Sequence, residues 1–304
     1  MPEASHHPAQ AGSIDLHAHT NESDGSLTPE ELVREARQAG LAALAITDHD
    51  TFSGYEKALP FARRLNFDLV RGIELNSRLE CNGNPTRWAH ILAFFPFGDP
   101  SKEFEEWLET QREDRRDRNK RLIASLSRQG VDITLEEVEA AGKSLTSRPH
   151  FAKVLVEKGY ASSHDDAFER YIGEDAPAFV ERQNPATEQV IQLIRAGGGI
   201  PVVAHPVRLM LPHDEVERDV LLRLKKAGLL GLEVYHSEHS PELQRYYLNL
   251  ANELELLPSG GSDFHGAAKP DTKLGSGRNG NVRVPFAFLQ NIRSRRDEFF
   301  PPAK

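Results

Sequence analysis

The chain has one cysteine, Cys81, in 304 residues, which excludes an internal disulfide and a cysteine-rich zinc site. A single cysteine also favours a reducing, cytoplasmic setting. No apolar stretch approaches the roughly 20 residues that a membrane helix needs, so we expect no membrane partner. Residues 1–12 lack a basic region followed by an apolar stretch, so we expect a flexible tail, with His6 and His7 in it, and no secretory signal.

The chain also lacks an excess of basic residues, because 37 Lys and Arg stand against 46 Asp and Glu, for a formal net charge of -9. Broad electrostatic binding to duplex nucleic acid depends on basic patches, and this balance argues against it. A chain with a negative net charge can still bind small anionic substrates, because bound metal ions can reverse the charge of one pocket.

The chain does contain a repeated pattern of short apolar runs that carry a histidine or a carboxylate at one end. Seven runs follow it: SIDLHAH, ALAITDH, LVRGIE, AHILAFF, PVVAH, LEVYH and LPSGGSDFH. Strands that repeatedly end in metal-ligand residues are typical of a barrel with a metal centre at the C-terminal ends of its strands, where barrel enzymes carry their chemistry. The pattern therefore predicts an α/β barrel enzyme.

The first hundred residues alternate between strand and helix patterns, which predicts parallel strands with right-handed crossovers. The first helix has Thr28 as its N-cap, Pro29 in its first turn and Glu31 at the capping-box position. Pro60 is expected to break the second helix.

Between residues 101 and 184 no strand pattern appears, and a long charged helix is followed by three shorter ones, each closed by a glycine. We predict an all-helical insertion domain, a lid over residues 101–184, between two strands of a barrel formed by 13–100 and 185–304. Without the insertion about 220 residues are left, close to the lower end for such a barrel.

Histidines and acids at the strand ends form the candidate metal site. His17 and His19 are two residues apart at a strand end, so both side chains point to the same side. Taken singly, Asp24 could bond its own backbone in a turn and His90 could be a core histidine. Because nine such residues occur together, we favour their interpretation as metal ligands. A set of imidazoles and carboxylates without thiolates suits Mn, Fe or Zn. The candidate ligands are His17, His19, Asp24, His49, Glu74, His90, His205, Asp263 and His265.

Residues 14–54, PVVAHP (201–206) and GGSDFHG (260–266) resemble the motifs of the PHP family, the polymerase and histidinol phosphatase metal-dependent phosphoesterases. The resemblance spans essentially the whole chain and implies a distorted barrel of seven strands. It implies a first metal site of His17, His19, Glu74 and Asp263, a second of Glu74, His90 and His205, and a third of Asp24, His49 and His265.

The same resemblance implies two or three divalent metal ions, with Mn2+ expected and Fe2+ or Zn2+ as alternatives. Glu74 would bridge two ions and so act as a catalytic residue. A hydroxide held between the ions would attack a phosphate ester in line, without a covalent enzyme intermediate.

The SRPHFAKVLVEKG segment resembles the helical insertion of a PHP subgroup that includes nucleoside 3',5'-bisphosphate phosphatases and enzymes that trim 5'-phosphorylated RNA. It implies a nucleotide substrate, short single-stranded RNA or DNA ends as further substrates, and no protein partner. Arg148 and His150 would hold a phosphate, since a guanidinium offers a planar fork. His239 would position phosphate or act as an acid. The alternatives are a surface arginine at a helix start and a loop histidine; His236 is a weaker candidate of the same kind.

Two further groups have competing interpretations. Arg112, Arg115, Arg116 and Asn119 share a helical spacing and could hold a second phosphate, or they could form a solvated face of salt bridges. Trp88, Phe94 and Phe95 could stack on a base or belong to the core.

Three other functions stay open from the sequence. One is hydrolysis of a different small ester such as histidinol phosphate, and another is C–N hydrolysis by an amidohydrolase-like metal barrel. The third is a non-catalytic PHP module, which would predict lost ligands and a fused partner, and the chain shows neither.

Overall fold

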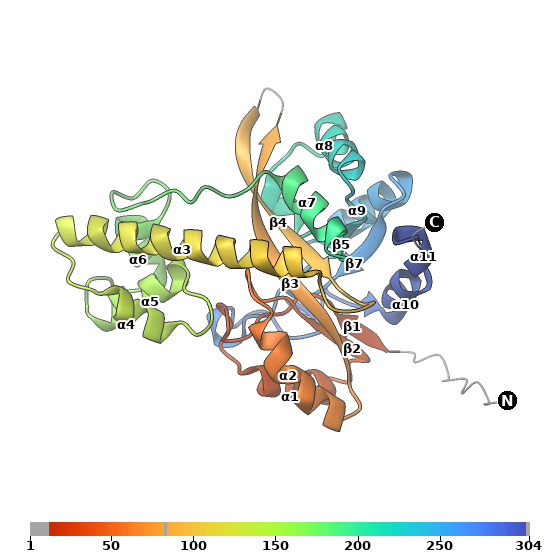
Figure 1. Ribbon diagram of the computed structural model, residues 1–304, viewed down its shortest axis with the longest axis horizontal. Coiled ribbons are helices and arrows are strands. Elements are labelled where there is room, and N and C mark those ends of the chain that lie inside the picture. The colour runs from red at the N-terminus through yellow and green to blue at the C-terminus, as the bar shows by residue number, and fades with distance from the viewer. Residues whose placement is uncertain (1–11, 82–83, 302–304) are drawn as a thin grey trace.

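The computed structural model describes residues 12–81 and 84–301. Residues 1–11 of the expected tail lie outside the described residues. Eight strands form a single sheet in the order β7-β6-β5-β4-β3-β2-β1-β8, with helices packed around it (Figure 1). The strands are β1 (Ser13–Asp15), β2 (Ala43–Ile46), β3 (Asp68–Cys81), β4 (Asn84–Phe94), β5 (Ile200–Val203), β6 (Gly231–Tyr235), β7 (Leu257–Gly260) and β8 (Val284–Pro285).

The sheet curls into a nearly closed barrel. At the end of the edge strand β7 and just after β1, the two ends of the sheet meet: the Leu16 N–H donates to the Gly260 carbonyl at 3.1 Å, and Ala18 forms a parallel bridge with Phe264. A Cβ at Gly261 would lie 2.3 Å from the His17 backbone nitrogen, so only glycine allows the chain after β7 to approach β1 this closely. The predicted barrel is confirmed, with the two-residue β8 as a strand that the seven runs did not include.

Two strands depart from the predicted parallel arrangement: β4, and the short β8, which is antiparallel to β1. β1, β2 and β3 are parallel, as are β5, β6 and β7, but β4 is antiparallel to both β3 and β5. β3 and β4 pair directly with each other as a hairpin, with Cys81 opposite Asn84, which is why the all-parallel expectation fails here. Because β4 runs in reverse, the N-terminal part of this strand faces the same barrel end as the C-terminal ends of its neighbours.

Helices cover the outside of the barrel. The Thr28–Glu31 capping box opens α1 as predicted, whereas Pro60 is accommodated inside α2 and does not end it. The helices are α1 (Pro29–Gln38), α2 (Ser53–Arg64), α7 (Thr187–Ala196), α8 (Glu215–Lys226), α9 (Pro241–Glu253), α10 (Phe286–Ser294) and α11 (Arg296–Phe299), with 3-10 turns at Pro206–Leu209 and Gly266–Ala268.

The chain between β4 and β5 is helical. It contains α3 (Lys102–Arg128), α4 (Leu135–Ala141), α5 (Arg148–Glu157), α6 (His164–Ala167) and a π-helical turn at Phe168–Ile172. The long α3 extends away from the sheet and carries α4, α5 and α6 beside its far end (Figure 1). Leu122, Leu126, Phe151 and Leu155 belong to a hydrophobic cluster of this segment's own residues. Within the described ranges, no helix has the length and apolar character to cross a bilayer.

Candidate metal centre and substrate cavity

The nine predicted ligand residues come together at one end of the barrel. His17, His19, His49, His205, Asp263 and His265 follow parallel strands, and their side chains meet where those strands end. Glu74 lies within β3, and His90 lies near the middle of the reversed β4, where it pairs with Asn76, two residues beyond Glu74. Because β4 runs opposite to its neighbours, the histidine of the AHILAFF run stands at the start of the run and not at its end.

Glu74 occupies the centre of the cluster. Its Oε1 lies 2.8 Å from His90 Nδ1 and 2.9 Å from His205 Nε2. Its Oε2 lies 3.2–3.4 Å from ring nitrogens of three further histidines, His17, His19 and His49. Burial alone would raise the pKa of Glu74, but the surrounding imidazoles hold it well below its usual range. The side chain is thus an ionised carboxylate with both oxygens directed at imidazoles.

Two aspartates extend the cluster on either side of Glu74. Asp263 Oδ1 lies 3.5 Å from Nε2 of both His17 and His19. Asp24 lies 3.4–3.6 Å from ring nitrogens of three histidines, His19, His49 and His265. Asp24 is therefore directed into the cluster and is not confined to a local turn.

These side chains form overlapping groups in which the ligand atoms lie within 4.8 Å of one another. The groups are His19–Asp24–His49–His265, His17–His19–Asp263, His17–Glu74–His205 and His49–Glu74–His90. His49 takes part in two of them, whereas the family resemblance implied only the site with Asp24. Buried ring nitrogens of His17, His19 and His49 lack a hydrogen-bond partner, as expected of atoms placed to bind a cation. This donor set fits divalent cations.

Two buried carboxylates that the sequence interpretation missed support the cluster from behind. Glu233 Oε1 lies 2.9 Å from His17 Nδ1, and its Oε2 accepts the backbone N–H of His205 at 2.5 Å. Burial would raise the pKa of Glu233, but the imidazole of His17 lowers it to about 2. Asp48 accepts from the N–H and hydroxyl of Thr20 at 2.7 and 2.6 Å. The signal for Glu233 was present in the sequence, since it is an acid inside the apolar run LEVYH.

Two cluster residues have an uncommon backbone conformation. The φ angles of His205 and Asp263 are 27° and 54°, in or near the left-handed region that non-glycine residues rarely adopt. Such conformations persist where the surrounding structure fixes them, and they concentrate at functional sites.

His236 and His239 have different relations to the cluster. His236 Nε2 lies 3.4 Å from Asp263 Oδ2. His239 is fully buried, donates from Nδ1 to the Val234 carbonyl at 2.8 Å, and packs on Tyr247 at 4.9 Å between ring centroids. The histidine with the weaker sequence signal thus reaches the cluster, and His239 lies behind it.

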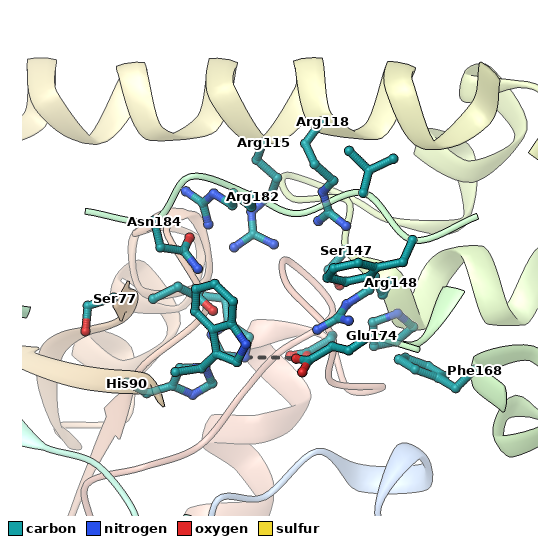
Figure 2. A pocket seen from close by; sticks show the side chains of 17 residues that line it. Ser77, His90, Arg115, Arg118, Ser147, Arg148, Phe168, Glu174, Arg182 and Asn184 are labelled. Carbon is teal, nitrogen blue, oxygen red and sulfur yellow. Dashed lines mark ion pairs between the residues drawn. The ribbon is translucent and has the colours of Figure 1, made fainter. Parts of the chain in front are cut away.

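A cavity of about 280 Å³ opens beside the cluster, close to the lower end of the roughly 300–1,000 Å³ typical of small-molecule sites. Asp24, His49 and His90 of the cluster line it. The long hairpin contributes Asn76, Ser77 and Trp88, and the helical segment and the chain after it contribute Arg115, Arg118, Ser147, Arg148, Phe168, Glu174 and Arg182 (Figure 2). The cavity therefore joins the barrel end to the helical segment.

The two predicted phosphate-binding residues of α5 differ in their contacts. Arg148 lines the cavity, with its guanidinium carbon 5.9 Å from the Phe168 ring centroid and 5.7 Å from that of Phe179. His150 is buried and accepts the Ser147 N–H on Nδ1 at 3.0 Å, which caps the start of α5. It does not belong to the cavity lining, so its visible contact positions the turn that carries Arg148.

The polar residues of α3 divide between two faces. Arg112 pairs with Glu109, and Arg116 Nε lies 2.7 Å from Glu139, so these two form the salt-bridged outer face. Asn119 donates to the Thr146 carbonyl at 3.0 Å. Arg115 faces the cavity and bonds Asp50.

Asp50 is a second link between the barrel and the helical segment. Besides Arg115, its Oδ2 accepts Nη1 of Arg182 at 2.8 Å. Burial would raise the pKa of Asp50, but the two guanidiniums hold it well below its usual range. Since Asp50 follows His49 directly in the chain, this ion pair ties the helical segment to the cluster.

The three aromatic candidates also separate. Trp88 lines the cavity and is half-buried, whereas Phe94 and Phe95 belong to the two hydrophobic clusters of the barrel. Of these three residues, only Trp88 is therefore placed to contact a base in the cavity.

Comparison with known proteins agrees with this geometry. The PHP domain model matches residues 15–194. A 5'-3' exoribonuclease of Haemophilus influenzae is 31% identical over 83% of this chain and 89% of its own length. A 3',5'-nucleoside bisphosphate phosphatase of Chromobacterium violaceum is 30% identical over 86% and 90%. A solved structure from Bifidobacterium adolescentis, assigned to the metal-dependent phosphoesterases, superposes with a TM-score of 0.78 at 32% identity, over 95% of this chain and 98% of that one.

Proposed function

This chain belongs to the PHP domain family of metal-dependent phosphoesterases, and we propose that it hydrolyses nucleotides that carry two phosphates, the nucleoside 3',5'-bisphosphates. Short 5'-phosphorylated oligonucleotides are proposed as further substrates. The observation that carries this proposal is the single cavity in which residues of the histidine–carboxylate cluster and several arginines face one another. The names of the two curated relatives, a bisphosphate phosphatase and an exoribonuclease, support the same substrate class.

We assign two or three Mn2+ ions to the nine-residue cluster, with Glu74 shared between ions because its two oxygens face different histidines. When bound, such ions polarise phosphoryl oxygens and acidify water. Glu233 would keep His17 oriented by holding its Nδ1, which leaves Nε2 free to act as a ligand. His239 is proposed to support the ring of His236 and not to contact substrate, because it has no exposed surface.

We assign substrate binding to the cavity wall formed by the helical segment, which we propose as an insertion domain over residues 101–184. Arg148 would bind a phosphate, and His150 would hold the turn that presents it. Trp88 would stack on the base. The cluster is deep in the barrel end, where His17, His19 and Glu74 are at most 1% exposed, so it is shielded from bulk solvent.

A substrate panel tests the proposal. Purified protein loaded with Mn2+ is incubated with adenosine 3',5'-bisphosphate, a 5'-phosphorylated trinucleotide, histidinol phosphate and a small amide, and the release of phosphate or amine is measured. We expect phosphate release from adenosine 3',5'-bisphosphate, release of a nucleoside 5'-monophosphate from the trinucleotide, which chromatography detects, and no product from histidinol phosphate. The Glu74→Gln variant, prepared identically, controls for contaminating phosphatases. Turnover of the amide without phosphate release would overturn the proposal.

A further inference from the structure

Glu22 joins three separate parts of the molecule. It lies in the loop between β1 and α1, two residues before the predicted ligand Asp24, and is 4% exposed. Its Oε2 accepts from the Ser53 hydroxyl at 3.0 Å and from Lys57 Nζ at 2.6 Å, both on α2. The hydroxyl of Ser144, in the chain between α4 and α5, donates to the same oxygen. This buried carboxylate therefore ties the helical segment to the loop that carries Asp24.

The tie through Asp50 ends beside a ligand in the same way. Asp50 directly follows His49 and bonds Arg115 and Arg182. His49 and Asp24 are members of one candidate cation site, which we call the outer group. The outer group consists of His19, Asp24, His49 and His265. Both ties thus end within two residues of a ligand of this one group.

Two other candidate cation sites, which we call the inner groups, have no such connection. The inner groups are His17–His19–Asp263 and His17–Glu74–His205. Among the described residues, no hydrogen bond or ion pair joins the helical segment to a residue within two positions of these ligands. The inner ligands are at most 5% exposed, whereas Asp24 and His49 are 13% and 14% exposed and line the cavity. The position of the helical segment should therefore affect the outer group and not the inner groups.

The Asp24 loop is held on the barrel side as well. Asp48 accepts the Ser23 hydroxyl at 2.6 Å, so Asp24 is positioned between one contact from the barrel and one from the helical segment. Supporting contacts orient metal ligands, and loss of one typically weakens metal affinity about 10- to 100-fold. A displaced Ser144 would remove one of the two supports of this loop.

We propose that Glu22 is a positioning residue through which the helical segment sets the affinity of the outer group for its cation. The proposal rests on the assignment of metal ions to the cluster, and it goes further by making one ion depend on a segment that supplies none of the ligands. Coupling of this kind is reciprocal, so occupancy of the outer group in turn holds the helical segment against the barrel. The outer cation site is therefore complete only when the opposite wall of the cavity is in place.

Calorimetric titration of the metal-free protein with Mn2+ tests this proposal. We expect the wild type to bind three ions, and the weakest binding event should be absent from Asp24→Asn, which assigns it to the outer group. Ser144→Ala removes the hydroxyl that ties the helical segment to Glu22. In this variant the weakest ion should bind about tenfold more weakly, at the lower end of the loss expected for a supporting contact, and the two tighter ions should bind as in the wild type.

Three further variants show whether the effect comes from the tie. Ser144→Thr keeps the hydroxyl and should restore most of the lost affinity. Ser162→Ala is the matched control, because it removes a serine hydroxyl that bonds a carboxylate, Asp166, within the helical segment, and it should match the wild type. If Ser144 acts through Glu22, the double variant Glu22→Ala/Ser144→Ala should bind the weakest ion no more weakly than Glu22→Ala alone.

The outcomes distinguish this inference from the proposed function. If the wild type binds no Mn2+, the metal assignment of the proposed function fails. If the wild type binds only two ions, if Ser144→Ala binds the weakest ion as tightly as the wild type, or if it weakens all three ions alike, the positioning role of Glu22 is wrong and the metal assignment stands.

Discussion

The cavity has two walls that use charge in different ways. The barrel wall consists of the histidine–carboxylate cluster and the β3–β4 hairpin, and the helical wall consists of the helical segment and the chain after it that carries Arg182. On the barrel wall, each carboxylate of the cluster faces imidazoles, and Glu74 alone lies within 3.4 Å of ring nitrogens of five histidines. On the helical wall, Asp50 balances Arg115 and Arg182, whereas no carboxylate pairs with Arg118 among the residues that the structure describes. The barrel wall therefore balances its charges with its own side chains, whereas the helical wall presents several guanidiniums to the cavity. We therefore expect the first to determine the chemistry and the second the choice of substrate.

The largest expected effect comes from Glu74→Gln on the barrel wall. The amide keeps the size of the side chain but removes the charge shared by the proposed ions, so metal content and turnover should fall together. We expect kcat to drop on the order of 1,000-fold, as loss of several kcal/mol of metal stabilisation implies. Elemental analysis alongside phosphate release checks this, and a variant with full metal content and full rate would show that Glu74 does not bridge.

Asp50→Asn tests how far the two walls depend on each other. Removing one partner of a buried ion pair leaves Arg115 and Arg182 uncompensated, and we expect the free energy of unfolding to fall by about 3 kcal/mol. Denaturant unfolding of the metal-free protein measures it. The control is Arg112→Gln, which breaks the partly exposed pair with Glu109 and should cost about 0–1 kcal/mol. Equal losses in the two variants would mean that Asp50 does not join the walls.

Glu233→Gln sharpens the comparison within the barrel wall. The variant keeps a side-chain oxygen for the His205 N–H but no longer holds His17 Nδ1 with a charge. Loss of such an outer contact should weaken metal affinity about 10- to 100-fold. Competition with a fluorescent chelator measures the affinity, and circular dichroism provides the folding control.

The smallest effect is expected on the hairpin side of the cavity, where Trp88→Ala removes the proposed base contact. Stacking on an aromatic side chain contributes about 1–3 kcal/mol per base, so KM for adenosine 3',5'-bisphosphate should rise about tenfold with kcat nearly unchanged. Hydrolysis of ribose 3,5-bisphosphate, which has no base, serves as the control and should be unaffected. A similar rise in KM for both compounds would place the base elsewhere.

The sequence predicted the barrel wall well because its information is local. A histidine or acid at the end of an apolar strand lies at the end of the barrel wherever that strand sits, so the nine residues could be named before their contacts were known. The sequence did not reveal that β4 runs in reverse or that Pro60 fits inside α2, because hairpin pairing and helix packing depend on residues distant in the chain.

The helical wall was harder to predict for a different reason. Charged residues follow one another along α3, and helical spacing alone does not tell which of them faces the barrel. Arg112 and Arg116 carried the same sequence signal as Arg115, yet they lie on the outer face, and Arg118 was overlooked. His239 resembled a strand-end histidine like the others, but its ring lies behind His236.

The place of the helical segment between β4 and β5 has a consequence for engineering. Arg115, Arg118, Arg148 and Arg182 all come from one uninterrupted stretch of chain, while the cluster comes from the barrel on both sides of it. A chimera could therefore exchange this stretch for that of a relative and acquire the relative's substrate preference with the catalytic end unaltered. Such a graft must still offer Asp50 two guanidiniums, or the donor sequence will misplace the loop that carries His49.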